Sequence, residues 1–151
     1  MALQAFCGLR SAEACRIDWS AVDLAQATVT VGPRIAKTRA RRVCPLPDCA
    51  IDWLKPYALQ TGPVAPPSYR QLFTQATSAA CESWPVNALR HTAISAKVAL
   101  TKNLAQCAYE SGNSPAVVQS HYNGLSAPET ASAWFNVRPT REPKIVRMIA
   151  G

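Results

Sequence analysis

The chain has 151 residues, 48% of them hydrophobic, which is enough for one hydrophobic core and short for two domains. Sixteen lysines and arginines against nine aspartates and glutamates give a formal net charge of +7, a balance that favours a polyanionic partner over acidic proteins or neutral metabolites. No run approaches the ~18 to 20 apolar residues that a membrane span needs, and no signal-peptide pattern opens the chain. We therefore expect a cytoplasmic protein with neither a membrane nor a small-molecule partner.

Six cysteines are present, but their spacing includes no C-x-x-C pair and no histidine at the distance typical of zinc fingers. We interpret them as reduced thiols that act as small buried hydrophobic residues. The sequence therefore predicts no disulfide framework, no metal site and no cofactor.

The beginning of the chain predicts two short helices joined by a tight turn. Residues 1–7 are apolar and compatible with a helix that Gly8 can end, and Ser11 can cap a second helix with Glu13 in its first turn. Arg10 then lies in the turn between the two helices.

A basic hairpin is predicted next. Residues 28–31 alternate with period two and, together with 42–46, predict two antiparallel strands with Lys37 near their connection. Five of the sixteen cations are concentrated there: Arg34, Lys37, Arg39, Arg41 and Arg42. Such a concentration is what phosphate binding requires.

The middle of the chain alternates between helices and a proline-rich loop. Residues 50–59 are helix-compatible, 61–68 contain three prolines and a glycine and predict a loop, and 69–80 predict a helix. Another helix should run from after Asn87 to about Leu100.

The last third predicts three more helices. Thr101 can cap a helix that Gly112 ends, Ser114 followed by proline opens the helix that ends at Tyr122, and residues 126–135 begin with a capping-box pattern. The fold class expected is mainly α with a small antiparallel β-sheet.

An enzyme that cleaves a phosphodiester with its own side chain needs a nucleophile, cations for the phosphate oxygens and an acid for the leaving oxygen. Arg10 and Arg90 suit bidentate phosphate contacts. Taken singly, each candidate has a plainer interpretation: Arg10 as a helix cap, Arg90 as an ion-pair partner of Glu13 or Glu110, and Tyr122 as a half-buried tyrosine at a helix end.

Taken together, the motifs resemble those of the tyrosine recombinases of the phage integrase family. In chain order they are GLRSAE at 8–13 for the family's GLRxxE box, KTR at 37–39 followed by VCPL at 43–46 for its lysine hairpin, NALRHT at 87–92 for HxLRHT, GNSP at 112–115 for the GHS turn, and Tyr122 nine residues after position 113. The resemblance extends from about Ala5 to Val137.

This resemblance implies a tyrosine-recombinase catalytic domain over residues 1–137 and a C-terminal tail over 138–151. It implies that Arg10 and Arg90 hold the scissile phosphate, that Lys37 protonates the 5′ oxygen, and that Tyr122 attacks to form a 3′-phosphotyrosyl link without metal or nucleotide. Glu13 would orient the first arginine.

The partner implied is double-stranded DNA, with self-association of the protein on it, in the recombination and integration of a mobile element. Such a protein would be bacterial or phage-encoded and associated with the nucleoid. Further DNA contacts are expected from a basic set: Arg34, Arg39, Arg41, Arg42 and His91.

Two positions depart from the family pattern. Asn87 stands where histidine or lysine is usual and Asn113 where histidine or tryptophan is usual; both are kept as catalytic-site candidates, although asparagine cannot hold a proton at neutral pH. The helix and arm domain that normally precede the first arginine are also missing, so we expect an N-terminally truncated domain. The alternatives are a weakened or inactive DNA-binding remnant, or a basic RNA- or protein-binding domain in which Arg10, Arg90 and Tyr122 do not converge.

Overall fold

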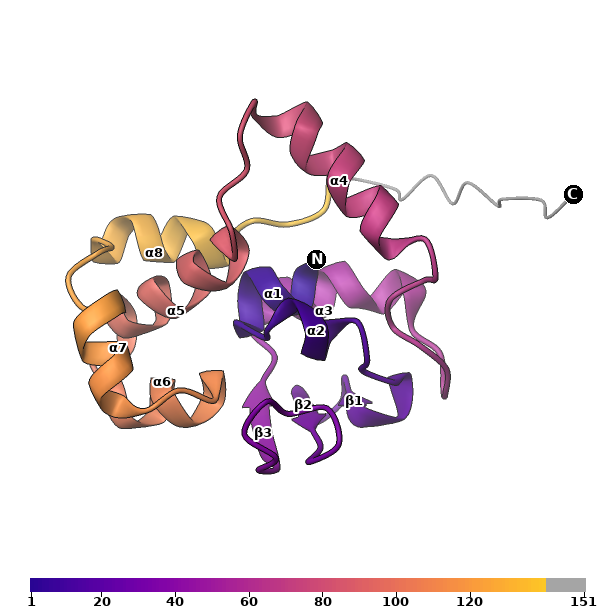
Figure 1. Ribbon diagram of the computed structural model, residues 1–151, viewed down its shortest axis with the longest axis horizontal. Coiled ribbons are helices and arrows are strands. Elements are labelled where there is room, and N and C mark those ends of the chain that lie inside the picture. Colours follow the sequence, from indigo (N-terminus) through magenta and orange to yellow (C-terminus); the bar gives the residue numbers. More distant parts are fainter. Residues whose placement is uncertain (141–151) are drawn as a thin grey trace, which may run out of the picture.

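The computed structural model describes residues 1–140, so most of the tail expected at 138–151 lies outside the described residues. Figure 1 shows a small sheet at one end of the molecule, with the helices above and beside it. The α-helices are α1 (Ala2–Cys7), α2 (Ser11–Ala14), α3 (Asp48–Leu54), α4 (Tyr69–Ala80), α5 (Ala88–Thr101), α6 (Leu104–Ser111), α7 (Pro115–Tyr122) and α8 (Pro128–Phe135). The strands are β1 (Val22–Asp23), β2 (Thr28–Val31) and β3 (Arg42–Pro45), and two 3₁₀ turns are η1 (Trp19–Ala21) and η2 (Lys55–Tyr57).

The sheet is antiparallel with strand order β1-β2-β3. In β2 and β3 the alternation of the sequence places Val29, Val31 and Cys44 on the buried face, and Val31 pairs with Arg42. The two strands expected from the sequence are confirmed. β1 was not expected, since a strand of two residues is too short to show a period.

The core lies in two parts. The larger joins α1, the sheet and α3, and the smaller joins α5, α6 and α7 around Ile94, Val98 and Val118. Late in the chain, α8 closes the structure: the ring of Trp134 packs against Phe6 and its Nε1 donates to the Ala5 carbonyl at 2.7 Å. In Figure 1, α1 and α8 both lie beside α5, and these are among the closest helix contacts in the described chain.

Helix α4 stands apart from the other helices at the edge of the molecule (Figure 1). Its bounds agree with the helix expected at 69–80. It is attached by the Tyr69 hydroxyl, which donates to Gln4 Oε1 at 2.6 Å, and by the edge of Phe73 against Trp84. Most of its surface is therefore exposed.

Helix ends differ from the sequence expectations where tertiary packing decides them. Ser114 caps α7 as expected, because its hydroxyl accepts from the Val117 N–H at 3.3 Å. The cap of α6 is Asn103 and not Thr101, since Thr101 still belongs to α5. The capping box expected at Ser126 does not form, because the Ser126 hydroxyl donates to the next carbonyl.

Two other helix boundaries move. The N-cap of α2 is Arg10, with Ser11 already helical. The helix expected at 50–59 begins earlier and passes into η2, because Pro56 cannot continue α-helical hydrogen bonding.

All six cysteines are free thiols. Four are buried as expected (Cys7, Cys44, Cys49 and Cys107), whereas Cys15 is only partly covered and Cys81 is exposed. Across residues 1–140, no helix is both long and apolar enough to cross a bilayer.

Candidate functional site

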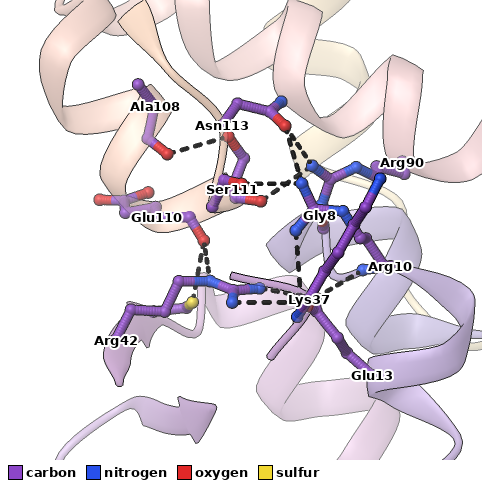
Figure 2. Close-up of polar contacts among 12 residues, drawn as sticks. Gly8, Arg10, Glu13, Lys37, Arg42, Arg90, Ala108, Glu110, Ser111 and Asn113 are labelled. Carbon is purple, nitrogen blue, oxygen red and sulfur yellow. Dashed lines mark hydrogen bonds and ion pairs between the residues drawn. The ribbon is translucent and has the colours of Figure 1, made fainter. Parts of the chain in front are cut away.

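Arg10 and Arg90 meet on one oxygen atom. The Nη2 atoms of Arg10 and Arg90 donate to Asn113 Oδ1 at 3.0 and 3.1 Å. In Figure 2 this oxygen faces the two guanidinium groups while the amide nitrogen of Asn113 points away from them. The three residues come from the turn before α2, the first turn of α5 and the turn after α6, so the site forms where three segments cross.

Backbone carbonyls complete the coordination of the two arginines. Arg10 Nη2 also donates to the Gly112 carbonyl at 2.7 Å. Arg90 donates to the Ser111 carbonyl at 2.8 Å and, through Nη1, to the Gly8 carbonyl. The acceptors of Arg90 are neutral, and the carbonyls bring no opposing charge to the pair.

Two glycines allow this approach. Gly8 ends α1 at a φ of +69°, and a Cβ there would lie 3.2 Å from Ile94 Cγ1, so the absence of a side chain lets α1 pack closely on α5. Gly112 ends α6 at a φ of +65°, and a Cβ there would lie 3.0 Å from Arg10 Nη1 and 3.1 Å from Arg42 Cζ. Two guanidinium groups therefore pack directly against Gly112.

Arg42 is buried and not on the exposed surface of the hairpin. It was predicted to contact DNA, but it is 3% exposed, and its Nη2 and Nη1 donate to Glu13 Oε2 and Oε1 at 2.6 and 3.2 Å. Its Nε donates to the Glu110 carbonyl at 3.0 Å. The prediction was wrong because β3 turns Arg42 inward, opposite Val31, towards a buried carboxylate.

Among the described residues, Glu13 is the only carboxylate that contacts the guanidinium groups of Arg10 and Arg42. It is 1% exposed, and it also accepts from Arg10 Nη1 at 3.3 Å and from the Arg10 backbone N–H at 3.0 Å. Burial would raise the pKa of Glu13, but the hydrogen bonds from Arg42 and Arg10 outweigh it and lower the pKa below its ordinary value. Glu13 is therefore ionised at neutral pH.

The charge of Arg90 is left largely uncompensated. Burial and the neighbouring Arg10 lower the pKa of Arg90 to about 10, with a smaller opposing effect from Tyr122. Neither Glu13 nor Glu110 hydrogen-bonds the guanidinium of Arg90, and the Glu110 carboxylate instead pairs with Lys97 at 2.8 Å. The ion pairs considered for Arg90 from the sequence are thus not formed.

Lys37 lies in the exposed loop between β2 and β3, and its backbone N–H approaches Glu13 Oε1 at 3.5 Å. Its side chain lines an open cavity of about 590 Å³ together with Arg10 and Asn113. Tyr109, 57% exposed, lines the same cavity, and its hydroxyl accepts from the Val43 N–H at 3.4 Å. Tyr109 belongs to no motif, and no pattern in the sequence indicates a role for it.

Tyr122 ends α7 and is 6% exposed. Its ring is stacked on that of His91, the residue after Arg90, with ring centroids 5.3 Å apart. The tyrosine thus lies next to the helix that carries Arg90, but it does not line the cavity of Arg10 and Lys37. Its hydroxyl makes no hydrogen bond within residues 1–140.

Asn87 does not join the arginine pair by any hydrogen bond within residues 1–140. It is exposed at the N-cap of α5, with a φ of +58° and no side-chain cap bond. It lines a separate cavity of about 380 Å³, which it shares with Arg90 and Trp84. The other basic residues expected to contact DNA are exposed on the β2–β3 loop: Arg34, Arg39 and Arg41.

The chain belongs to the phage integrase family, whose family model matches residues 1–121. The crystal structure of XerA recombinase has a similar fold, with a TM-score of 0.67 over 92% of this chain and 57% of that chain. The two sequences are 18% identical, so this similarity concerns the fold, and the chain spans little more than half the length of XerA recombinase. No curated protein matches the sequence significantly. The family resemblance and the fold class expected from the sequence are both confirmed.

Proposed function

We propose that residues 1–137 form the catalytic domain of a recombinase that cleaves and rejoins DNA strands, with Tyr122 as the nucleophile. The observation that carries the proposal is the convergence of Arg10 and Arg90 on the neutral amide oxygen of Asn113. Two guanidinium groups that meet on a shared neutral oxygen form a site that favours an anion with two neighbouring oxygens. A phosphodiester has both properties.

In this reaction the Tyr122 hydroxyl loses its proton to water, its oxygen attacks phosphorus, and the bond from phosphorus to the 5′ oxygen breaks. Arg10 and Arg90 bind the two non-bridging oxygens, and Lys37 gives a proton to the departing 5′ oxygen. The phosphotyrosyl ester keeps the energy of the broken bond, so the 5′ hydroxyl of a second strand can reverse the step without a nucleotide. The Tyr122 ring is packed against that of His91, beside the helix that carries Arg90.

The partner proposed is double-stranded DNA, bound by several copies of the protein, in the recombination or integration of a mobile element in a bacterial or phage setting. The exposed loop cations Arg34, Arg39 and Arg41 would contact phosphates beyond the cleaved one. DNA affinity should fall steeply with salt, because each phosphate contact releases counterions.

A second candidate is a DNA-binding domain that has lost turnover. Asn113 favours it: its Oδ1 is occupied by two guanidinium donors, and its Nδ2 is buried without a partner among the described residues. Neither atom can take the proton of the Tyr122 hydroxyl. Loss of a positioned base typically slows a reaction by ~10² to 10⁴.

Covalent trapping separates the two candidates. The substrate is a pool of nicked duplexes with random sequence around the nick, and the products are separated on a denaturing gel. We expect a protein–DNA adduct with the wild type and with Tyr109→Phe, and none with Tyr122→Phe. Tyr109 is the matched control because it is the exposed tyrosine in the cavity of Lys37.

Each other result has a definite meaning. An adduct that persists in Tyr122→Phe, or disappears in Tyr109→Phe, contradicts the assignment of the nucleophile. Salt-dependent DNA binding with no adduct from any of the three proteins favours the domain without turnover.

A further inference from the structure

Two guanidinium groups, those of Arg42 and Arg10, contact the Glu13 carboxylate, and they do not share it equally. Arg42 binds Glu13 with two hydrogen bonds, the shorter at 2.6 Å, whereas the Arg10 side chain makes one contact at 3.3 Å. Bidentate geometry and short distance mark the stronger ion pair. Figure 2 shows Arg42 reaching Glu13 from the hairpin side, while Arg10 and Arg90 lie together at Asn113.

Differences in burial also favour the ion pair of Glu13 with Arg42 over the contact of Glu13 with Arg10. The side chains of Arg42 and Glu13 are 4% and 1% exposed, and that of Arg10 is 22% exposed. Solvent therefore screens the interaction of Glu13 with Arg10 more than its interaction with Arg42. If Arg42 were absent, Arg10 would be the remaining side-chain cation on Glu13 among the described residues, and the carboxylate would compete with any phosphate for it.

Arg42 also holds the turn that carries Asn113. Its Nε donates to the Glu110 carbonyl at 3.0 Å, and its Cζ would lie 3.1 Å from a Cβ on Gly112. The same guanidinium thus contacts the end of α6 on one side and α2 on the other. It fixes the distance between the segment of Arg10 and the segment of Asn113.

We propose that Arg42 is a positioning residue for the phosphate site: by neutralising Glu13 and holding the α6 turn, it leaves the Arg10 guanidinium free to bind a DNA phosphate. This inference rests on the proposed function. Arg42 itself lies behind the site and does not touch DNA.

A double-mutant cycle tests the inference through DNA binding. The proteins are wild type, Arg42→Gln, Glu13→Gln and the double variant, and the measurement is the Kd for a short fluorescent duplex at several salt concentrations. We expect Arg42→Gln to weaken binding about tenfold and to lower the salt slope by about 0.9, the value of one phosphate contact. Glu13→Gln should restore both quantities in the double variant, because no carboxylate is left to hold Arg10.

Arg41 provides the matched control, because it is the neighbouring arginine and is exposed. The control cycle combines Arg41→Gln with Glu13→Gln and so removes the same charges. We expect the effects of these two substitutions on the Kd to be independent within about twofold. Coupling between Arg42 and Glu13 that is no larger than this control value would overturn the proposal.

Arg42→Lys separates positioning from simple support of the fold. Lysine keeps a charge beside Glu13 but loses the bidentate contact, so we expect a lower Tm with a DNA affinity within about threefold of wild type. Affinity that falls about tenfold or more below wild type contradicts the proposal. This variant decides the question even where Arg42→Gln does not fold.

The two proposals fail in different ways. DNA binding without a covalent adduct removes strand cleavage and leaves the Arg42 cycle intact as a test. Sulfate binding is measured as a rise in the Tm of the wild-type protein. If the wild-type protein binds neither the duplex nor sulfate, both proposals are overturned.

Discussion

The Nη2 atoms of Arg10 and Arg90 lie 3.0 and 3.1 Å from the same atom, Oδ1 of Asn113, although residues 10 and 113 are 103 positions apart in the chain. A neutral amide thus holds two cations together without cancelling their charge. This arrangement gives Asn113 a role that a histidine would not share, since the amide oxygen accepts two hydrogen bonds and never titrates.

Two substitutions of Asn113 separate its contribution to protein stability from the effect of its lack of charge on DNA binding. Asn113→Ala removes an acceptor of the buried Arg90, and we expect a loss of about 2 kcal/mol of stability with weaker DNA binding. Asn113→Asp adds a charge that strengthens both hydrogen bonds, so stability should rise while DNA affinity falls about tenfold. Urea unfolding and fluorescence anisotropy at pH 7 measure the two quantities. Parallel changes of stability and affinity in Asn113→Asp would contradict this role.

Gly112 and Gly124 form a matched pair of glycines with positive φ, +65° and +76°. A Cβ on Gly124 meets no atom within 4 Å, so Gly124→Ala should cost only the conformational penalty of about 1 kcal/mol. Gly112→Ala should cost about 1 to 2 kcal/mol more, because the Arg10 and Arg42 guanidinium groups must shift, and it should weaken DNA binding. Urea denaturation tests the difference; equal losses for the two variants would show that the guanidinium groups move freely.

Glu13 makes stability depend on pH in the acid range. Its pKa in the folded protein is below the ordinary value of 4.5, so its contribution is complete above that pH and is lost as the pH falls through the lowered value. Glu13→Gln should remove this part of the acid sensitivity. At neutral pH the same change should cost about 3 kcal/mol, since it leaves Arg42 buried without its partner. Urea midpoints at successive pH values check the prediction, and superimposable profiles for the two proteins below pH 4.5 would refute it.

The cysteines should differ widely in reactivity. Burial raises the pKa of Cys7 to about 12 and also raises that of Cys44, so both thiols remain protonated and covered at pH 8. Cys81 is exposed at the end of α4. We expect maleimide to label Cys81 in the native protein and to reach Cys7 and Cys44 only after unfolding, as mass spectrometry of the peptides would show. Labelling of Cys7 as fast as that of Cys81 would contradict the packing around α1.

Local signals in the sequence were sufficient for several elements. The helix over 69–80 has no internal breaker and follows a proline-rich loop, and Ser114 followed by proline marks a helix start by its own chemistry. The position of Arg10 in the turn before α2 and that of Arg90 in the first turn of α5 also follow from local signals, because glycine and helix-start residues stand next to them.

Other features depend on contacts between distant segments. Arg42 is buried because it pairs with the carboxylate of Glu13, 29 residues earlier. The sequence alone does not distinguish it from the exposed Arg41, since both are arginines in the same basic segment. The carbonyl of Ser111 binds Arg90, and backbone acceptors carry no side-chain signal. How far Tyr122 is buried is likewise set by the packing of α7 on α5.

The contact between Trp134 and Ala5 spans 129 residues and joins the last described helix to the first. Arg10 is synthesised 102 and 103 residues before its acceptors at 112 and 113. A nascent chain that has not yet reached Asn113 therefore lacks the oxygen that holds Arg10 beside Arg90.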